Sequence, residues 1–290
     1  MSADDLRDRL RALEAHTGVR TLLLAASNID LDLLPPLDDA LARIGPVPRL
    51  DVVVYLRGGE VEAARQLAFR LQAATPRLRF LVPHFCASSG TILALAADEI
   101  LAGPLAMFSP IDPHLAGAGD RPDLPAVLSA EDLRRLPEAI EAWFGLAPDV
   151  AAAQARALLD ARIAPETLAT FERTVRALEA TGDALLARHI ASPEARAAIV
   201  RTLLTGYGSH DYAITGDELR ALGLPVTRDP AIEALAWDVT CAVRRTIGPE
   251  SRASLSEDWH DAAVADTQAV ALRRRTRGQR AGTWNAHAEA

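Results

Sequence analysis

A strand-to-helix turn in the first third of the chain constrains the fold more than any other feature. Residues 80–82 are apolar and strand-like, and Pro83 cannot continue a ladder. Ala87-Ser88-Ser89-Gly90 then allows a tight bend before an apolar run, residues 92–97, which indicates a short buried helix. Such a turn directs the Ser88 hydroxyl toward free helix amides, where developing negative charge is favoured. Ser88 is therefore a candidate nucleophile, although serines also cap helices for hydrogen-bonding reasons alone.

Three further segments contain groups that a serine nucleophile needs, because its hydroxyl is weak until a base takes the proton and a third group orients that base. A buried strand predicted over residues 50–56 ends at Arg57-Gly58-Gly59, and paired glycines let backbone amides face a substrate carbonyl oxygen. A segment with two prolines, residues 108–114, ends in the imidazole of His114. The pair His210-Asp211 supplies a second imidazole and a carboxylate.

In this order, these segments resemble the serine dehydrogenase proteinase (SDH) family of ClpP-class serine peptidases, within the Clp-protease/crotonase superfamily. The resemblance covers roughly residues 51–226. Its anchors are Arg57-Gly58-Gly59, Val82 to Ile100, Pro110-Ile111-Asp112-Pro113, and His210-Asp211 through Gly223-Leu224. It implies an α/β fold, a ClpP/crotonase-like parallel sheet of ββα-type units with an inserted helical segment. It implies no cofactor and no metal.

Position by position, the resemblance implies that Ser88 is the nucleophile, His114 the general base and Asp211 the carboxylate that orients the base. In the closer family a glutamine often stands at the position of His114. His210 is therefore an alternative base.

The resemblance also implies an oxyanion hole, formed by the amide of Ser89 together with that of Gly58 or Gly59. This chain departs from the family pattern just before the glycines, where Arg57 replaces the usual proline. The sequence contains no lysine, so all 31 residues counted as lysine or arginine are arginines. Arginine stays protonated, which excludes the Ser-Lys dyad of the signal peptide peptidase branch.

The predicted function is that of a serine peptidase, which hydrolyses peptide bonds through an acyl-enzyme. One alternative is a non-catalytic ClpP-like oligomeric scaffold, suggested by Arg57 and by the uncertain base. A second is a crotonase-type acyl-CoA enzyme, which uses a similar oxyanion site on a thioester. A peptide or protein substrate and self-association into a homo-oligomer are expected, and an unfoldase or regulatory partner stays open.

Composition is consistent with a cytoplasmic globular protein. The chain has 290 residues, 49% of them hydrophobic, so it can bury a sizeable core. Its net charge of −8 argues against a nucleic-acid protein. No secretory signal and no membrane span are predicted. Two cysteines, Cys86 and Cys241, are too few for a disulfide framework, and Cys86 is expected to be a buried packing residue.

Alternating strand and helix patterns, beginning with a strand at 21–26 and a helix at 35–44, predict one ClpP/crotonase-like domain over residues 1–229. It contains a helical insertion at about 129–204, broken at three prolines. Residues 230–290 are predicted to form helices at 231–245 and 258–272. A basic run at 273–280 then begins a disordered tail.

Overall fold

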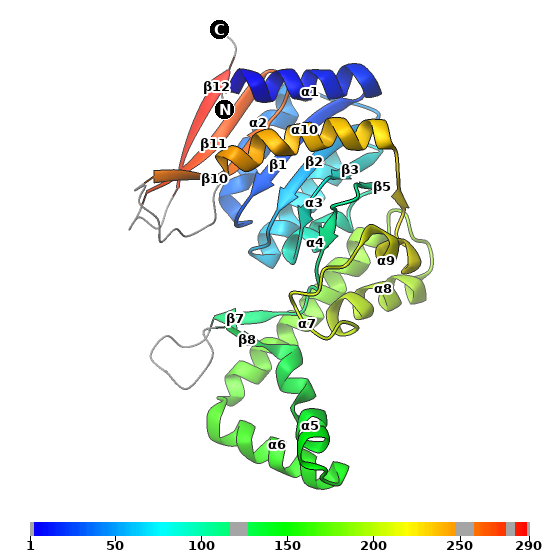
Figure 1. Cartoon of the computed structure of the whole chain (residues 1–290), viewed down its shortest axis with the longest axis vertical. Coiled ribbons are helices and arrows are strands. Elements are labelled where there is room, and N and C mark those ends of the chain that lie inside the picture. Colours follow the sequence, from blue (N-terminus) through cyan, green and yellow to red (C-terminus); the bar gives the residue numbers. More distant parts are fainter. Residues whose placement is uncertain (1–2, 117–126, 248–257, 277–281, 289–290) are drawn as a thin grey trace.

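A parallel sheet forms the centre of the molecule (Figure 1). The computed structural model describes residues 3–116, 127–247, 258–276 and 282–288. The parallel strands lie in the order β1 (Arg20–Ala26), β2 (Leu50–Leu56), β3 (Leu78–Val82), β5 (Glu99–Ala102) and β9 (Val226–Thr227). Two short strands, β4 (Phe85–Cys86) and β6 (Met107–Phe108), extend the sheet beyond the end of β2. The α/β class predicted from the sequence is confirmed.

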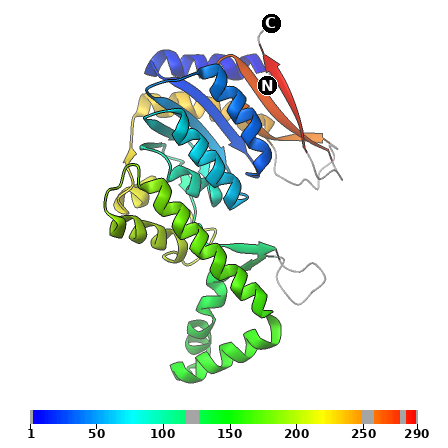
Figure 2. The same ribbon diagram turned by 180° about the vertical axis from the view of Figure 1, so that it is seen from behind.

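Helices cover both faces of this sheet (Figures 1 and 2). One face packs against α1 (Ala3–Thr17) and α10 (Pro230–Thr246). The other packs against η1 (Leu31–Leu33), α2 (Leu34–Ile44), α3 (Val61–Ala74) and α4 (Ser89–Ala94). Successive residues of a strand point to opposite faces of the sheet. Val52 and Val54 therefore belong to the hydrophobic core on the side of α2, α3 and α4, whereas Val53 and Tyr55 belong to the core on the side of α1 and α10. The strands are apolar on both sides because both sides are buried.

The helical insertion projects away from the sheet as an arm (Figures 1 and 2). A hairpin of β7 (His114–Ala116) and β8 (Val127–Ser129) leads into it, followed by α5 (Ala130–Phe144), α6 (Pro148–Arg162), α7 (Pro165–Leu186) and α8 (Pro193–Thr205). The last three helices begin at Pro148, Pro165 and Pro193, the three prolines at which the insertion is predicted to break. Proline is favoured there because the first helical amide has no intrahelical partner. No helix of the described residues is both long and apolar enough to cross a membrane.

A short helix, α9 (Gly216–Ala221), returns the chain to the sheet at β9. Its first turn is closed by a capping box, in which the Thr215 hydroxyl accepts from the Glu218 amide and the Glu218 carboxylate accepts from the Thr215 amide. The helix ends before Gly223, whose φ of 97° suits glycine. This return places the 207–215 segment over the ends of the parallel strands.

The prediction for the C-terminal segment is half wrong. The helix expected at 231–245 is present as α10, but the segment expected to be a helix at 258–272 forms strands β10 (Asp258–Ala265) and β11 (Ala269–Thr276). A third strand, β12 (Thr283–Ala288), pairs with β11, and β10 pairs antiparallel with β1. The alanine-rich sequence favours a helix locally. The open edge of β1 supplies a ladder of backbone hydrogen bonds, which overrides that propensity.

The basic run is likewise ordered where the structure describes it, contrary to the predicted disordered tail. Arg273 is wholly buried in β11 and donates to both carboxylate oxygens of Asp261, at 2.9 and 3.0 Å. This bidentate ion pair stabilises Arg273 in a buried position, although the basic sequence pattern alone predicts a solvent-exposed side chain. The rest of the run, from 277, and the glycine-rich loop at 117–122 lie outside the described residues.

Candidate active site

Ser88 lies at a strained turn between β4 and α4. Its φ of 54° and ψ of −121° make it the only residue other than glycine with a positive φ in the part of the chain that the structure describes. Such a conformation costs on the order of 1–3 kcal/mol and persists only where surrounding contacts enforce it. Here the Ser88 amide donates to the Ser109 hydroxyl at 2.7 Å, and the Gly90 amide donates to the Ala87 carbonyl at 2.8 Å. The strand-to-helix turn predicted from the sequence is confirmed.

The paired glycines run alongside this turn. A side chain at Gly58 would place its Cβ 3.0 Å from the Cβ of Ser88, and one at Gly59 would collide with the backbone of Ile29. Both glycines have positive φ, 123° and 143°. The Ile29 amide donates to the Gly58 carbonyl, and the Glu60 amide donates to the Ile29 carbonyl, each at 2.7 Å. These bonds hold the glycines against Ser88.

Two backbone amides at this junction are free to bind a ligand. Among the described residues, neither the Gly59 amide nor the Ser89 amide donates to a protein acceptor. Ser89 begins α4, so its amide has no intrahelical partner. Both residues line the same pocket as Ser88.

Arg57 is accommodated although it is large and charged. It is exposed, and its guanidinium lies 4.8 Å from the centre of the Phe85 ring, a favourable cation–π contact. It also donates to the Tyr55 hydroxyl at 3.2 Å. The side chain thus packs on aromatic rings, and both glycines that follow it have a positive φ.

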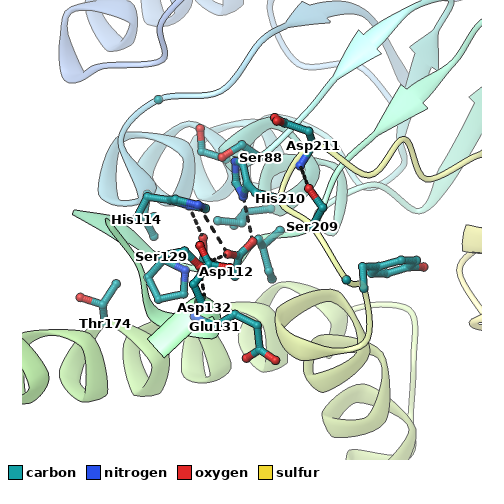
Figure 3. Close-up of a pocket in the computed structure, with 18 residues that line it drawn as sticks. Ser88, Asp112, His114, Ser129, Glu131, Asp132, Thr174, Ser209, His210 and Asp211 are labelled. Atoms are coloured by element: carbon teal, nitrogen blue, oxygen red, sulfur yellow. Dashed lines mark hydrogen bonds and ion pairs between the residues drawn. The ribbon is translucent and has the colours of Figure 1, made fainter. Parts of the chain in front are cut away.

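A carboxylate that the sequence analysis did not assign joins the two imidazoles. Nδ1 of His210 donates to Oδ1 of Asp112 at 2.8 Å, and Nε2 of His114 lies 3.6 Å from Oδ2 of Asp112. Nδ1 of His114 donates to the backbone carbonyl of Asp112 at 3.0 Å. The imidazole rings of His114 and His210 meet edge to face, with centroids 3.9 Å apart. Figure 3 shows this cluster and, in its view, the His210 ring between Asp112 and Ser88.

Asp112 is held in its ionised form. Its side chain is almost fully buried, and burial acts to raise the pKa of Asp112. The hydrogen bond from His210, the charges of both imidazoles and a hydrogen bond from Ser129 act in the opposite direction and prevail, so the pKa lies below its ordinary value. An ionised carboxylate can fix the tautomer of His210 and stabilise its protonated form.

All of the predicted site residues except Gly58 line one cavity of about 840 Å³. Its lining includes Ser88, Ser89, Gly59, His114, His210 and Asp211. Helix α5 and helix α7 of the arm contribute Glu131, Asp132 and Thr174 to the same lining. Two helices of the arm therefore form part of the pocket wall.

Asp211 is placed differently from its predicted role. Its backbone amide donates to the Ser209 hydroxyl at 3.2 Å, but among the described residues its carboxylate forms no hydrogen bond or ion pair with an imidazole. The carboxylate in contact with both imidazoles is Asp112. The signal for it was present in the sequence, since Asp112 belongs to one of the anchors and stands two positions before His114.

Cys86, close to the turn in sequence, is a packing residue as predicted. Its thiol is fully buried and donates to the Gly90 carbonyl at 3.1 Å. Burial strongly raises the pKa of Cys86, which keeps it protonated and unreactive.

A parallel α/β sheet with a strained serine turn, free amides opposite it and an imidazole–carboxylate pair in the same pocket is the layout of a serine hydrolase. Residues 41–138 match the family of ClpP-like SDH-type serine proteinases. The predicted family resemblance is therefore confirmed over these residues. The matched residues include the two glycines, Ser88, Asp112 and His114, and they end before His210.

The chain is also similar to two curated proteins and to a solved structure. Two uncharacterized proteins of Methanocaldococcus jannaschii, MJ0137 and MJ1495, are 29% and 25% identical over 65% and 61% of this chain. The chain spans 58% and 51% of their lengths. The solved structure of a 1510-N membrane-bound stomatin-specific protease, in a serine-to-alanine mutant, has a TM-score of 0.45 and 15% identity, over 72% of this chain and 79% of the other.

Proposed function

We propose that this chain is a serine peptidase in which Ser88 is the nucleophile, His210 the general base and Asp112 the carboxylate that orients the base. The observation that carries the proposal is the 2.8 Å bond from Nδ1 of His210 to Asp112, in the pocket that also contains the strained Ser88. With Nδ1 protonated and bound, the lone pair of His210 is on Nε2, on the far side of the ring from Asp112. It is the atom that takes the Ser88 proton.

The reaction follows from these groups. The Ser88 oxygen attacks the carbonyl carbon of a peptide bond while Nε2 of His210 accepts the hydroxyl proton. The charge on the former carbonyl oxygen would be held by the amides of Gly59 and Ser89, which line the same pocket as Ser88. The imidazolium then gives the proton to the leaving amine. Water next attacks the acyl-enzyme while His210 takes its proton, and this proton returns to the Ser88 oxygen as the acid product leaves.

This assignment differs from the first expectation drawn from the resemblance, with His114 as base and Asp211 as its partner. Nδ1 of His114 is bound to a neutral backbone carbonyl, which stabilises an imidazolium less than a carboxylate does. His210 was the alternative base, and its bond to Asp112 supports it. The peptide substrate is inferred from the family resemblance, and the arm residues Glu131, Asp132 and Thr174 line the pocket that would receive it.

A fluorophosphonate probe tests the nucleophile directly. The wild type is expected to be labelled, and mass spectrometry should locate the label on Ser88. Ser88→Ala is expected to abolish labelling, whereas Ser209→Ala, which removes another hydroxyl of the same pocket, is expected to retain it. A well-folded wild type that does not react would contradict the proposal and support a non-catalytic scaffold.

The base is tested by comparing His210→Asn with His114→Asn under the same labelling conditions. General-base catalysis contributes roughly 10²–10⁴-fold, so the labelling rate of His210→Asn should fall by that order. His114→Asn should lose much less. The reverse order of effects would assign the base to His114.

A further inference from the structure

The cluster of Asp112, His114 and His210 has a second chemical capacity. Its three side chains place one donor atom each within 4.8 Å of one another, and it is the only such group of three in the described chain. Two imidazoles and one carboxylate are a ligand set that proteins use for Zn²⁺, with a fourth position left open.

The spacing of the donor atoms suits that ion. Zinc binds imidazole nitrogen at about 2.0–2.1 Å in a tetrahedral arrangement, which requires donor atoms about 3.3–3.5 Å apart. Nδ1 of His210 and Nε2 of His114 lie 2.8 and 3.6 Å from the two oxygens of Asp112. These two nitrogen–oxygen separations bracket the required value, and one donor atom of each residue lies within 4.8 Å of the others, so the three side chains must move closer together to bind one ion.

The surroundings already orient the ligands. The bond from Nδ1 of His114 to the Asp112 carbonyl leaves its Nε2 with a lone pair, on the side of the Asp112 carboxylate. The Ser129 hydroxyl donates to Oδ2 of Asp112 at 3.1 Å and holds that carboxylate in place. Hydrogen bonds of this kind around a metal site typically account for 10–100-fold in metal affinity. The cavity in front of the cluster gives an ion access from solvent.

We propose that Asp112, His114 and His210 bind Zn²⁺ and that the bound ion inhibits the peptidase, the inhibition resting on the function proposed above. The ion replaces the proton on Nδ1 of His210, which is released to solvent. The remaining ring proton of the neutral ligand is then on Nε2. That nitrogen can no longer accept the proton of Ser88, so zinc and catalysis exclude each other.

Metal binding is measured on the full chain without any need for activity. Competition with a chromophoric zinc chelator should give 1:1 binding in the wild type and in Ser88→Ala. Affinity should fall at least about tenfold in His114→Asn and in Asp112→Asn. His16→Asn, which removes an exposed imidazole of α1, should leave it unchanged. Equal affinity in wild type and both cluster variants would overturn the zinc site.

A second measurement does not depend on the folding of any variant. Wild type titrated with Co²⁺ should show the strong visible absorption of a four-coordinate ion, and Zn²⁺ should remove it. Absence of such a band at saturating Co²⁺ would also overturn the site.

Inhibition is tested by fluorophosphonate labelling with and without Zn²⁺. The wild-type rate should fall at least tenfold at saturating zinc, whereas His114→Asn, compared with its own metal-free rate, should need at least about ten times more zinc. Zinc binding without any labelling of metal-free protein would refute the peptidase and leave the metal site standing. Labelling that is unaffected by bound zinc would refute the inhibition.

Discussion

Asp112 combines three properties in one side chain: it is buried, ionised and in contact with two imidazoles. A carboxylate in this position fixes the Nδ1 tautomer of His210 and stabilises the imidazolium that forms during attack. The proposed role of Asp112 therefore depends on its contacts with the two imidazoles as much as on its charge.

Asp112→Asn tests this role while preserving side-chain size. The amide cannot stabilise the imidazolium and can bind the wrong tautomer of His210, so the fluorophosphonate labelling rate should fall roughly 10²–10⁴-fold. Asp211→Asn is the matched control and should have a much smaller effect. A larger loss in Asp211→Asn would return the orienting role to the carboxylate first expected from the family.

Gly59 is the residue whose backbone leaves least room for change. Gly59→Ala adds a Cβ that collides with the Ile29 backbone and forces alanine into a φ near 143°, so it should both lower the free energy of unfolding and reduce labelling. Gly18→Ala is the control, since Gly18 also has positive φ but open space around it. Denaturant unfolding should show a loss of order 1–3 kcal/mol beyond that of the control.

The residues of this site differ in how far sequence reasoning could predict them. Ser88 and the glycines could be predicted, because small residues at strand ends constrain their own backbone locally. The pairing of His210 with Asp112 could not be, since the two are 98 positions apart and meet only once the arm and α9 have returned the chain to the sheet. Asp211 was chosen by its adjacency to His210, and adjacency does not determine where a side chain points.

The same distinction holds for whole elements. Helices α6, α7 and α8 begin at prolines, a local signal, and were predicted correctly. Strands β10 and β11 were predicted as helix, because alanines and arginines favour helix locally while the edge of β1 that captures β10 is more than 200 positions away. The pairing of strands that are far apart in the chain cannot be predicted from the local pattern of a single sequence.

Arg273 of strand β11 contacts the segment that lies beside the paired glycines. Besides Asp261, its guanidinium binds the Asn28 carbonyl at 3.1 Å and Oδ1 of Asp30 at 2.5 Å. These two residues flank Ile29, whose backbone holds Gly58. The hairpin of β10 and β11 thus stabilises Gly58 and Gly59 through its contacts with residues 28–30.

Arg273→Met should therefore affect both stability and reactivity. It removes both hydrogen bonds from Arg273 to the buried carboxylate of Asp261, which keeps the bond from Arg275 at 2.7 Å, and breaking a buried pair costs up to about 3–5 kcal/mol. Denaturant unfolding should show that loss, and labelling of the folded fraction should be slower. Arg274→Met, at the exposed neighbouring position of β11, is the control. A stability loss with unchanged labelling would separate the hairpin from the site.

The first turn of α10 carries an acid-sensitive pair. Arg228 donates to both oxygens of the buried Glu233, at 2.6 and 2.9 Å. The hydrogen bond and charge of Arg228 outweigh burial and lower the pKa of Glu233. A carboxyl whose pKa is lower in the folded state stabilises the fold above its unfolded pKa, about 4.3, and loses that contribution as pH falls through the folded pKa.

Glu233→Gln should weaken the dependence of the free energy of unfolding on pH. In the wild type the free energy of unfolding should decrease as the pH falls below about 4.3, and the decrease should be smaller in the variant. Glu179→Gln, at an exposed position of α7, should follow the wild type. Parallel curves for wild type and Glu233→Gln would contradict the assignment.

At the scale of the whole molecule, the arm has little core of its own. Buried residues between α5 and α6 number only Ile140, Ala151 and Ala155 among those described, packed with Leu136 and Leu146. At the end of α5, Trp143 is 85% exposed and Phe144 69% exposed. Large apolar side chains left in water next to a small core favour packing against another surface. Self-association, predicted from the sequence, would provide that surface.

Light scattering after size-exclusion chromatography should therefore give a mass that is a multiple of 31.0 kDa for the wild type. The double variant Trp143→Ser, Phe144→Ser should shift the population toward smaller species, because it removes the two most exposed large apolar side chains of the described residues. Leu105→Ser, which changes an exposed apolar residue outside the arm, should not. Since α5 and α7 of the same arm line the cavity, dissociation should also slow labelling of Ser88. A monomeric wild type would contradict the self-association, and the arm would then act on the pocket within a single chain.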